Sequence, residues 1–241
     1  MARDTALLAR AARTGETVFS IYSWARPTLS FGRHQPAAGH YDPEKITAAS
    51  VDVVRRPTGG RAILHHREVT YSVTAPLEDE SLRATYGRIN GILVDGLSRL
   101  GIPATIAAPA GRAPVPGTRP CFELPSEGEV IAGGKKLVGS AQWRDENALL
   151  QHGSILVEDD QSLLPSLAVA GHANSNEVME PATLREILGR SPDPREVAES
   201  MFEAVRSVDD SEVTRIDEEE IREEALRHVP HFTDESWTWR R

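Results

Sequence analysis

The sequence predicts an α+β fold with mixed, largely antiparallel sheets flanked by helices. One reason is a set of short segments rich in β-branched and aromatic residues, such as 18–24 and 28–32, each bounded by turn-forming residues. A second is a small number of amphipathic stretches with apolar residues at three- and four-residue spacing. A third is their order, because hairpin-like strand pairs are interspersed with helices instead of alternating regularly with them.

The first half of the chain begins with a predicted helix over 3–14, in which Leu7, Leu8 and Ala11 share one face. A second helix is expected over 42–49, because Asp42 suits the N-cap and Pro43 suits the first helical position. Strands are expected at 18–24, 28–32, 52–56 and 68–76.

The longest predicted helix covers 82–100, where Ile89, Leu93 and Leu97 continue one apolar stripe and Gly101 suits the C-cap. Residues 107–120 are rich in proline, glycine and alanine without periodicity, which indicates a surface loop leading to Cys121. The later elements are predicted from pattern alone: strands at 129–134, 136–143 and 148–157, the last of them central, and helices at 161–168 and 194–208.

The length of 241 residues suits one main domain, predicted over 1–208, followed by a small acidic C-terminal appendage over 209–241. The appendage is expected to contain a short strand, an acidic helix over 217–227 and a tail with two tryptophans. Of the net charge of −9, the segment 209–224 contributes most, with nine acids and two arginines. This overall acidity argues against a nucleic-acid partner.

Compartment is predicted from what the sequence lacks. No run of eighteen apolar residues occurs, so no membrane-spanning segment or membrane partner is expected, and the first sixteen residues lack the apolar stretch of a signal peptide. A single cysteine cannot form an internal disulfide. We therefore expect a cytoplasmic protein.

Cys121 and Lys136 are the residues best suited to covalent chemistry. A lone cysteine is more often a small buried apolar residue than a nucleophile. Cys121, however, follows Pro120 in an irregular segment, and Lys136 follows fifteen residues later in the glycine-flanked turn GGKKLVG. A nearby ammonium lowers the pKa of a thiol and so favours the nucleophilic thiolate. We expect Lys136 to be the functional lysine and Lys135 to be solvated.

The segment RRPTGGRAILHH, from Arg55 to His66, is the other candidate site element. Consecutive glycines allow backbone amides to approach an anion or a carbonyl group, although a tight turn between strands explains the pattern equally well. It is not a Walker A loop. His65, His66 and His152 lack metal-ligand spacing, so we expect them to be structural or substrate-contacting and expect no metal site.

Five segments in order resemble the lipoate–protein ligase and octanoyltransferase superfamily, which shares its catalytic domain with biotin–protein ligases. They are MARDTALL, WARPTLSFGRHQ, RRPTGGRAILHHREVTYSV, GKKLVGSAQWR and LLQHGSILV. The segment CFELPS before the lysine is similar to that of the LipM-type octanoyltransferases, whereas lipoate ligases generally lack this cysteine. The sequence departs from this branch at Glu127-Gly128, where an aromatic pair is common, and at His66, where aspartate is usual.

The resemblance implies a fold, a reaction and a site. Residues 1–208 would form the acyltransferase catalytic domain. Cys121 and Lys136 would be catalytic, with octanoyl passing from acyl carrier protein to Cys121 and then to a lysine of a lipoyl-domain protein such as glycine cleavage H protein. Neither ATP nor another cofactor would be needed. The residues implied to bind the acyl group are Arg56, Thr58, Gly59, Gly60, Arg61, Ala62, His65, Gly139, Ser140, Ala141, Gln142, His152 and Gly153.

Three other functions remain open at this point. An ATP-dependent lipoate–protein ligase would use Lys136 and ignore Cys121. A lipoyl amidotransferase would retain covalent chemistry with a different acyl donor. A non-catalytic module that binds an acyl carrier would need neither residue.

Overall fold

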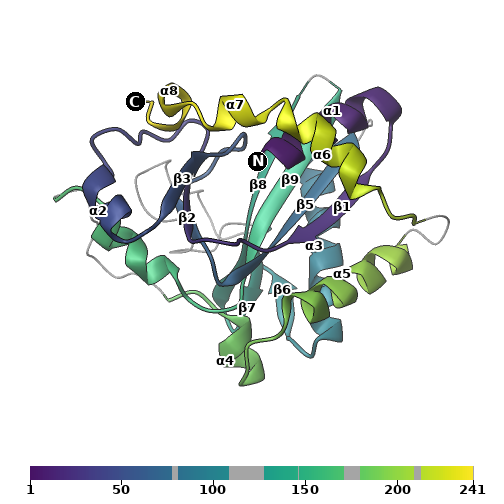
Figure 1. The fold of residues 1–241 in the computed structure, drawn as a ribbon. Coiled ribbons are helices and arrows are strands. Elements are labelled where there is room, and N and C mark those ends of the chain that lie inside the picture. Colours follow the sequence, from purple (N-terminus) through teal and green to yellow (C-terminus); the bar gives the residue numbers. More distant parts are fainter. Residues whose placement is uncertain (78–80, 109–127, 146, 171–179, 209–212, 241) are drawn as a thin grey trace.

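The structure is a computed structural model that describes residues 1–77, 81–108, 128–145, 147–170, 180–208 and 213–240. It confirms the α+β class, with a large six-stranded sheet and a small three-stranded sheet (Figure 1). The large sheet has the order β1 (Val18–Tyr22), β5 (Glu68–Pro76), β9 (Ala148–Leu156), β8 (Lys135–Arg144), β7 (Val130–Ala132) and β6 (Ala104–Ile106). The small sheet has the order β3 (Asp52–Arg55), β2 (Thr28–Phe31) and β4 (Ile63–His65).

All neighbours in the large sheet are antiparallel, and in the small sheet only β2 and β3 run parallel. The predicted central strand is confirmed, since β9 lies between β5 and β8 and is buried along its whole length. Its apolar sequence follows from burial on both faces. Leu149 and Ile155 enter the main core, whereas Ala148 and Leu150 pack on the opposite face of the sheet.

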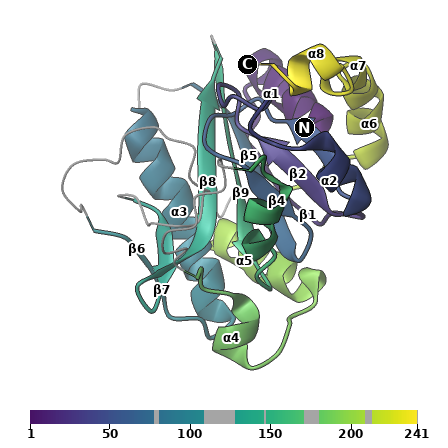
Figure 2. The ribbon, with the colours of Figure 1, turned by 90° about the vertical axis from the view of Figure 1, so that its left-hand side faces the viewer.

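Helices cover both faces of the large sheet. The main core lies under α3 (Leu82–Arg99) and α5 (Pro194–Val208), and Figure 2 shows α3 on the side of β8 opposite to the small sheet. The two helices approach closely at Gly96, where an added Cβ would lie 2.5 Å from the sulfur of Met201. On the other face, Leu8 of α1 (Ala2–Thr14) packs against Leu150.

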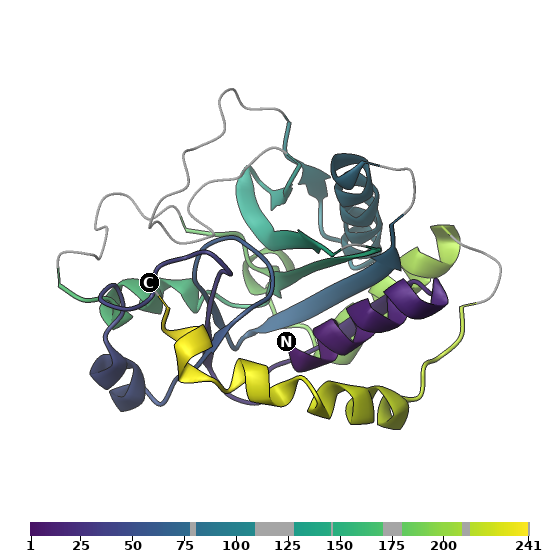
Figure 3. The same cartoon turned by 90° about the horizontal axis from the view of Figure 1, so that it is seen from above.

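The acidic helix of the predicted appendage, α6 (Glu218–Leu226), lies along α1 (Figure 3). Three arginines of α1 pair with three glutamates of α6 at 2.7–2.8 Å: Arg3 with Glu218, Arg10 with Glu220, and Arg13 with Glu224. Ile221 packs in one apolar cluster with Leu7 and Val18, so the contact also has an apolar part. The boundary at residue 208 stays a prediction.

The last described residues reach the small sheet and contact Arg55 at the end of β3. This guanidinium is fully buried and donates hydrogen bonds to the carbonyl oxygens of Gly32, Gln35, Trp237 and Thr238 at 2.5–2.9 Å. Burial, with two neighbouring arginines, lowers the pKa of Arg55 to about 10. Arg55 therefore ties the C-terminal segment to the strand that leads into the glycine loop.

Most predicted elements are confirmed, some with different boundaries. Asp42 caps α2 (Pro43–Ala48) by accepting from the backbone of Glu44 and Lys45. The predicted helix over 161–168 is instead a 3₁₀ helix, η1 (Gln161–Leu167), which contains Pro165.

The prediction of a short strand after residue 209 is wrong as far as residues 213–217 are concerned, because these residues form no strand. The elements that the sequence did not predict are short: β4, β6, α4 (Leu184–Leu188), α7 (Val229–Phe232) and α8 (Glu235–Thr238). Among the described residues, no helix combines the length and apolar character that crossing a membrane requires.

Candidate active site

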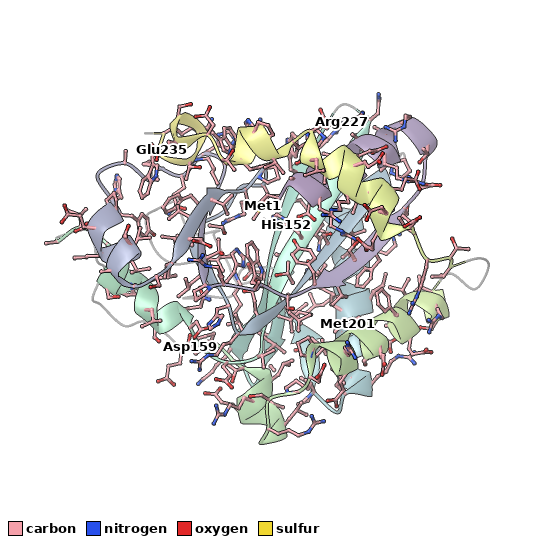
Figure 4. The ribbon with its side chains drawn as sticks, in the orientation of Figure 1. Met1, His152, Asp159, Met201, Arg227 and Glu235 are labelled. Carbon is pink, nitrogen blue, oxygen red and sulfur yellow. The ribbon has the colours of Figure 1, made fainter. Side chains whose placement is uncertain are left out.

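A pocket lies between the two sheets and opens to solvent, with about 410 Å³ of empty space when the solvent at its mouth is included. The small sheet and its loop contribute Arg56, Gly60, Ile63 and His65. Strands β8 and β9 supply the opposite wall as two three-residue runs, 139–141 and 152–154. Figure 4 labels His152 on β9 and Met1, which also lines the pocket.

The structure places most of the predicted acyl-binding residues at this pocket. Those that line it are Arg56, Gly60, His65, Gly139, Ser140, Ala141, His152 and Gly153. Thr58, Gly59, Arg61, Ala62 and Gln142 do not line it. Their role in acyl binding, like that of the lining residues, stays a prediction.

Sequence reasoning missed the pocket residues Met1, Tyr22, Trp24, Ile63, Thr70 and Ser154. Tyr22 and Trp24 share a face, because residues two apart in an extended chain point the same way. Tyr22 pairs with Thr70 in the sheet, and Thr70 pairs with Ser154. Alternation could have placed these side chains on one face, but only the strand register shows that this face meets the pocket.

The glycine loop closes over the side chain of Arg56, which is buried. The guanidinium donates to the carbonyl oxygens of Gly59 at 2.8 Å, Arg61 at 2.7 Å and Ser30 at 3.2 Å. Gly60 has a φ of 92°, in the region that favours glycine. Arg56 therefore shapes the loop from within, while Gly60 makes the turn.

Gly60 and Gly59 offer a matched pair of substitutions. In Gly60→Ala the positive φ would be strained, and the new Cβ would lie 2.7 Å from Nη2 of Arg56. We expect a loss of about 1–3 kcal/mol in the free energy of unfolding. Gly59→Ala should have nearly the same free energy of unfolding as the parent protein, since no atom lies within 4 Å of its added Cβ. Urea unfolding of both variants tests this, and equal stabilities would contradict the assigned loop geometry.

His152 connects the first helix to the glycine loop. Its Nδ1 lies 3.0 Å from Oδ2 of Asp4, and its Nε2 lies 2.6 Å from Oγ1 of Thr58. Burial lowers the pKa of His152, and the Asp4 carboxylate only partly opposes this, so the neutral ring is favoured. In that state Nδ1–H donates to Asp4 and Nε2 accepts from the Thr58 hydroxyl.

His65 forms a second chain of the same kind. Its Nδ1 lies 2.8 Å from Oε1 of Glu68, and its Nε2 lies 2.7 Å from Oγ of Ser30. The ring of Trp24 stacks on His65 at 4.3 Å between centroids. Both chains have the hydrogen-bond order of a hydroxyl–histidine–carboxylate triad. Ser30 and Thr58 are fully buried and do not line the pocket, so these chains hold its walls in place and present no nucleophile to it.

Lys136 lies on β8, and its side chain is only 2% exposed. Its Nζ donates to Oε1 of Glu129 at 2.6 Å. Lys135 instead makes a 3.7 Å ion pair with Glu180, whose side chain is 78% exposed. Lys135 is therefore solvent-exposed, as predicted, whereas the functional role of Lys136 stays a prediction.

Lys136 does not itself line the pocket, but a polar cluster connects the two. Ser140, two alternations further along β8, lines the pocket and accepts a 2.7 Å hydrogen bond from the Tyr71 hydroxyl. Tyr86 on α3 lies near Ser140 and close enough to Lys136 and Glu129 to interact electrostatically with both. Burial raises the pKa of Tyr86, and the Glu129 carboxylate adds to the rise.

Cys121 lies outside the described residues. Its pairing with Lys136 therefore stays a prediction, as does its part in any reaction. The described site contains a pocket, a glycine loop, two buried histidine chains and a buried lysine–glutamate pair.

Residues 1–206 match the family model of the lipoyl protein ligase A/B catalytic domain. The chain is 36% identical to octanoyltransferase LipM of Kyrpidia tusciae, an alignment that covers 100% of this chain and 94% of the relative. It is 38% identical to octanoyltransferase LipM of Moorella thermoacetica, over 85% and 79% of the two chains. The chain therefore belongs to the lipoyl protein ligase A/B catalytic domain family. The similarity to LipM octanoyltransferases confirms the branch expected from the sequence.

Solved structures confirm the fold. Lipoate-protein ligase A bound with ATP has a TM-score of 0.78 at 20% identity, covering 99% of this chain and 92% of its own. A bi-partite lipoate protein ligase of Thermoplasma acidophilum, studied with its E2 lipoyl domain, has a TM-score of 0.78 at 19% identity, covering 99% and 89%.

Proposed function

We propose that this protein transfers an octanoyl group from acyl carrier protein to a lysine of a lipoyl-domain protein, through a thioester on Cys121. The observation that carries the proposal is the similarity to LipM octanoyltransferases along the whole chain, at 36% identity. The buried Lys136 supports it, because its ammonium is held on the strand that also lines the pocket.

The pocket between the sheets would hold the acyl chain. Burying the eight-carbon chain away from water would favour binding by about 0.8 kcal/mol per methylene. Gly153 of β9 pairs with Ser140 of β8, and an added Cβ at Gly153 would lie 2.4 Å from the carbonyl oxygen of Gly139. Only glycine at position 153 allows the two strands to approach this closely.

The first half-reaction forms the acyl-enzyme. The Cys121 thiolate attacks the carbonyl carbon of the octanoyl thioester, a new carbon–sulfur bond forms, and the bond to the carrier sulfur breaks. The departing carrier thiolate takes a proton from the Lys136 ammonium. Lys136 is then neutral.

The second half-reaction transfers the acyl group to the acceptor. Neutral Lys136 takes one proton from the acceptor ammonium, and the free amine attacks the thioester carbon. The bond to the Cys121 sulfur breaks, the amine loses its second proton to solvent, and the thiolate is restored. Because amide formation from a thioester is downhill, no ATP is consumed.

The acceptor is proposed to be a lipoyl domain, with glycine cleavage H protein as the specific candidate. The family supports a lipoyl-domain acceptor, and a structural neighbour was studied with its E2 lipoyl domain. Lysine is the residue whose amine can form the stable amide that this mechanism requires.

Intact mass after mixing with octanoyl-acyl carrier protein, without ATP, tests the proposal. We expect one added octanoyl group, which is lost when a lipoyl domain is added. An ATP-dependent ligase, such as the structural neighbour bound with ATP, would gain no acyl group under these conditions. A non-catalytic module would neither gain the group nor modify the lipoyl domain with ATP present.

A further inference from the structure

Glu129 and Lys136 form a buried ion pair that the mechanism above uses only in part. Their side chains are 9% and 2% exposed, and the two charged atoms are 2.6 Å apart. Removing two charges from water costs several kcal/mol per ion before their attraction offsets it. A surface pair, such as Lys135 with Glu180, has no such cost. The buried position therefore calls for a functional explanation.

The backbone brings the two residues together. Glu129 directly precedes β7, and Ile131 of β7 pairs with Lys136 of β8. The carbonyl oxygen of Lys136 accepts a hydrogen bond from the backbone of Ala182, which fixes the strand on its other side. The ammonium is thus held at a defined place. Tyr86 and Tyr71 are titratable groups near the pair, and the Glu129 carboxylate adds to the raised pKa of both.

We propose that Glu129 is a positioning residue that keeps Lys136 protonated and in place for the first half-reaction. This inference rests on the proposed function. A carboxylate in contact with a buried amine favours its charged form, whereas burial alone favours the neutral form. Only the protonated amine can supply the proton that the departing carrier thiolate needs.

The two half-reactions make different demands on this pair. Forming the acyl-enzyme consumes the proton of Lys136, so it requires the ammonium that Glu129 stabilises. Discharge to the acceptor begins with neutral Lys136, which is present with or without Glu129. Losing the carboxylate weakens Lys136 as a base but does not remove the form that reacts. Loss of Glu129 should therefore slow the first step selectively, whereas damage confined to the fold should slow both steps.

The experiment measures the two steps separately in Glu129→Gln, Glu129→Asp and the control Glu180→Gln. Acyl-enzyme formation is followed by intact mass in single-turnover mixing with octanoyl-acyl carrier protein. Discharge is followed by adding a lipoyl domain to the purified acyl-enzyme. The control removes the same charge from the pair made by the neighbouring lysine. Thermal unfolding of each variant reports on the fold.

We expect Glu129→Gln to slow acyl-enzyme formation by about 10- to 100-fold and discharge by less than about threefold. The first effect is smaller than the roughly 100- to 10,000-fold loss of a general acid, because Lys136 itself is still present. Glu129→Asp should recover part of the lost rate, because it restores the charge, and Glu180→Gln should match the parent protein in both steps. An equal slowing of both steps in Glu129→Gln, or an unchanged first step, would overturn the inference.

A failure of the proposed function gives a different result. In that case the parent protein would form no acyl-enzyme at all. If the parent is acylated and discharged normally but Glu129→Gln shows no difference between the steps, only the role of Glu129 is wrong. If Glu129→Gln does not fold, Glu129→Asp carries the test, and an aspartate variant that folds but slows both steps equally contradicts the inference.

Discussion

Replacing Cys121 with alanine is expected to abolish octanoyl transfer, with a fall in rate on the order of 1,000-fold or more. The reason is that no thioester can form without the thiol, and the chain contains no other cysteine to replace it. Octanoyl transfer from the carrier to a lipoyl domain, measured by intact mass of the acceptor, provides the test. The same variant should show no added octanoyl group itself.

Cys121→Ser is the matched control, because it keeps the size of the side chain and replaces the thiol by a poorer nucleophile. We expect it to be as inactive as the alanine variant or to form a slowly discharged ester. Circular dichroism should show both variants folded. Transfer close to the parent rate in Cys121→Ala would rule out the covalent route and favour an ATP-dependent ligase.

Replacing Lys136 should have the second-largest effect and should act on the thiol as well as on the rate. If the ammonium lies beside Cys121, the thiol pKa in the parent protein should be below its usual value of about 8.5. Lys136→Ala should raise it and leave less thiolate at neutral pH. Transfer should fall further than the thiolate fraction alone explains, because Lys136 also moves the proton. Iodoacetamide alkylation of Cys121 against pH, with transfer rates, measures both effects.

Lys136→Ala should also lower stability, because Lys136 is one partner of a buried ion pair. Removing Lys136 leaves the Glu129 carboxylate buried without its ammonium partner, which should cost about 3–5 kcal/mol of stability. The double variant Lys136→Met with Glu129→Gln should recover stability but not transfer. Lys135→Ala should change neither alkylation nor transfer. If the Lys136→Ala alkylation curve overlays that of the parent, the two residues are not paired.

Much of the fold was predictable because its signals are local. The cap at Asp42 and the apolar stripe of α3 are encoded within a few residues, and both are confirmed. β4, only three residues long, was missed because its strand character depends on pairing with β2. The helix expected at 161–168 is a 3₁₀ helix, since Pro165 removes a donor that a regular α-helix would use.

The candidate site was only partly predictable, because the sequence indicated single residues but not the contacts between them. The sequence singled out Lys136 over Lys135 from the glycine-flanked turn and the family resemblance, and the structure separates them by burial. It did not indicate Glu129 as the partner, because nothing in a lone glutamate before a short strand shows which side chain it will meet. Trp24 and Thr70 were missed for a similar reason, since their place at the pocket depends on strand register.

By itself, the sequence determined the fold class, the family and the candidate chemical groups, because these depend on residue types, their spacing and their order along the chain. The tertiary structure alone decided which of those groups meet. It placed Asp4 of the first helix against His152 of β9, and the end of the chain against Arg55. Such contacts join residues far apart in sequence, and they follow from how the two sheets and their helices pack, which no local pattern encodes.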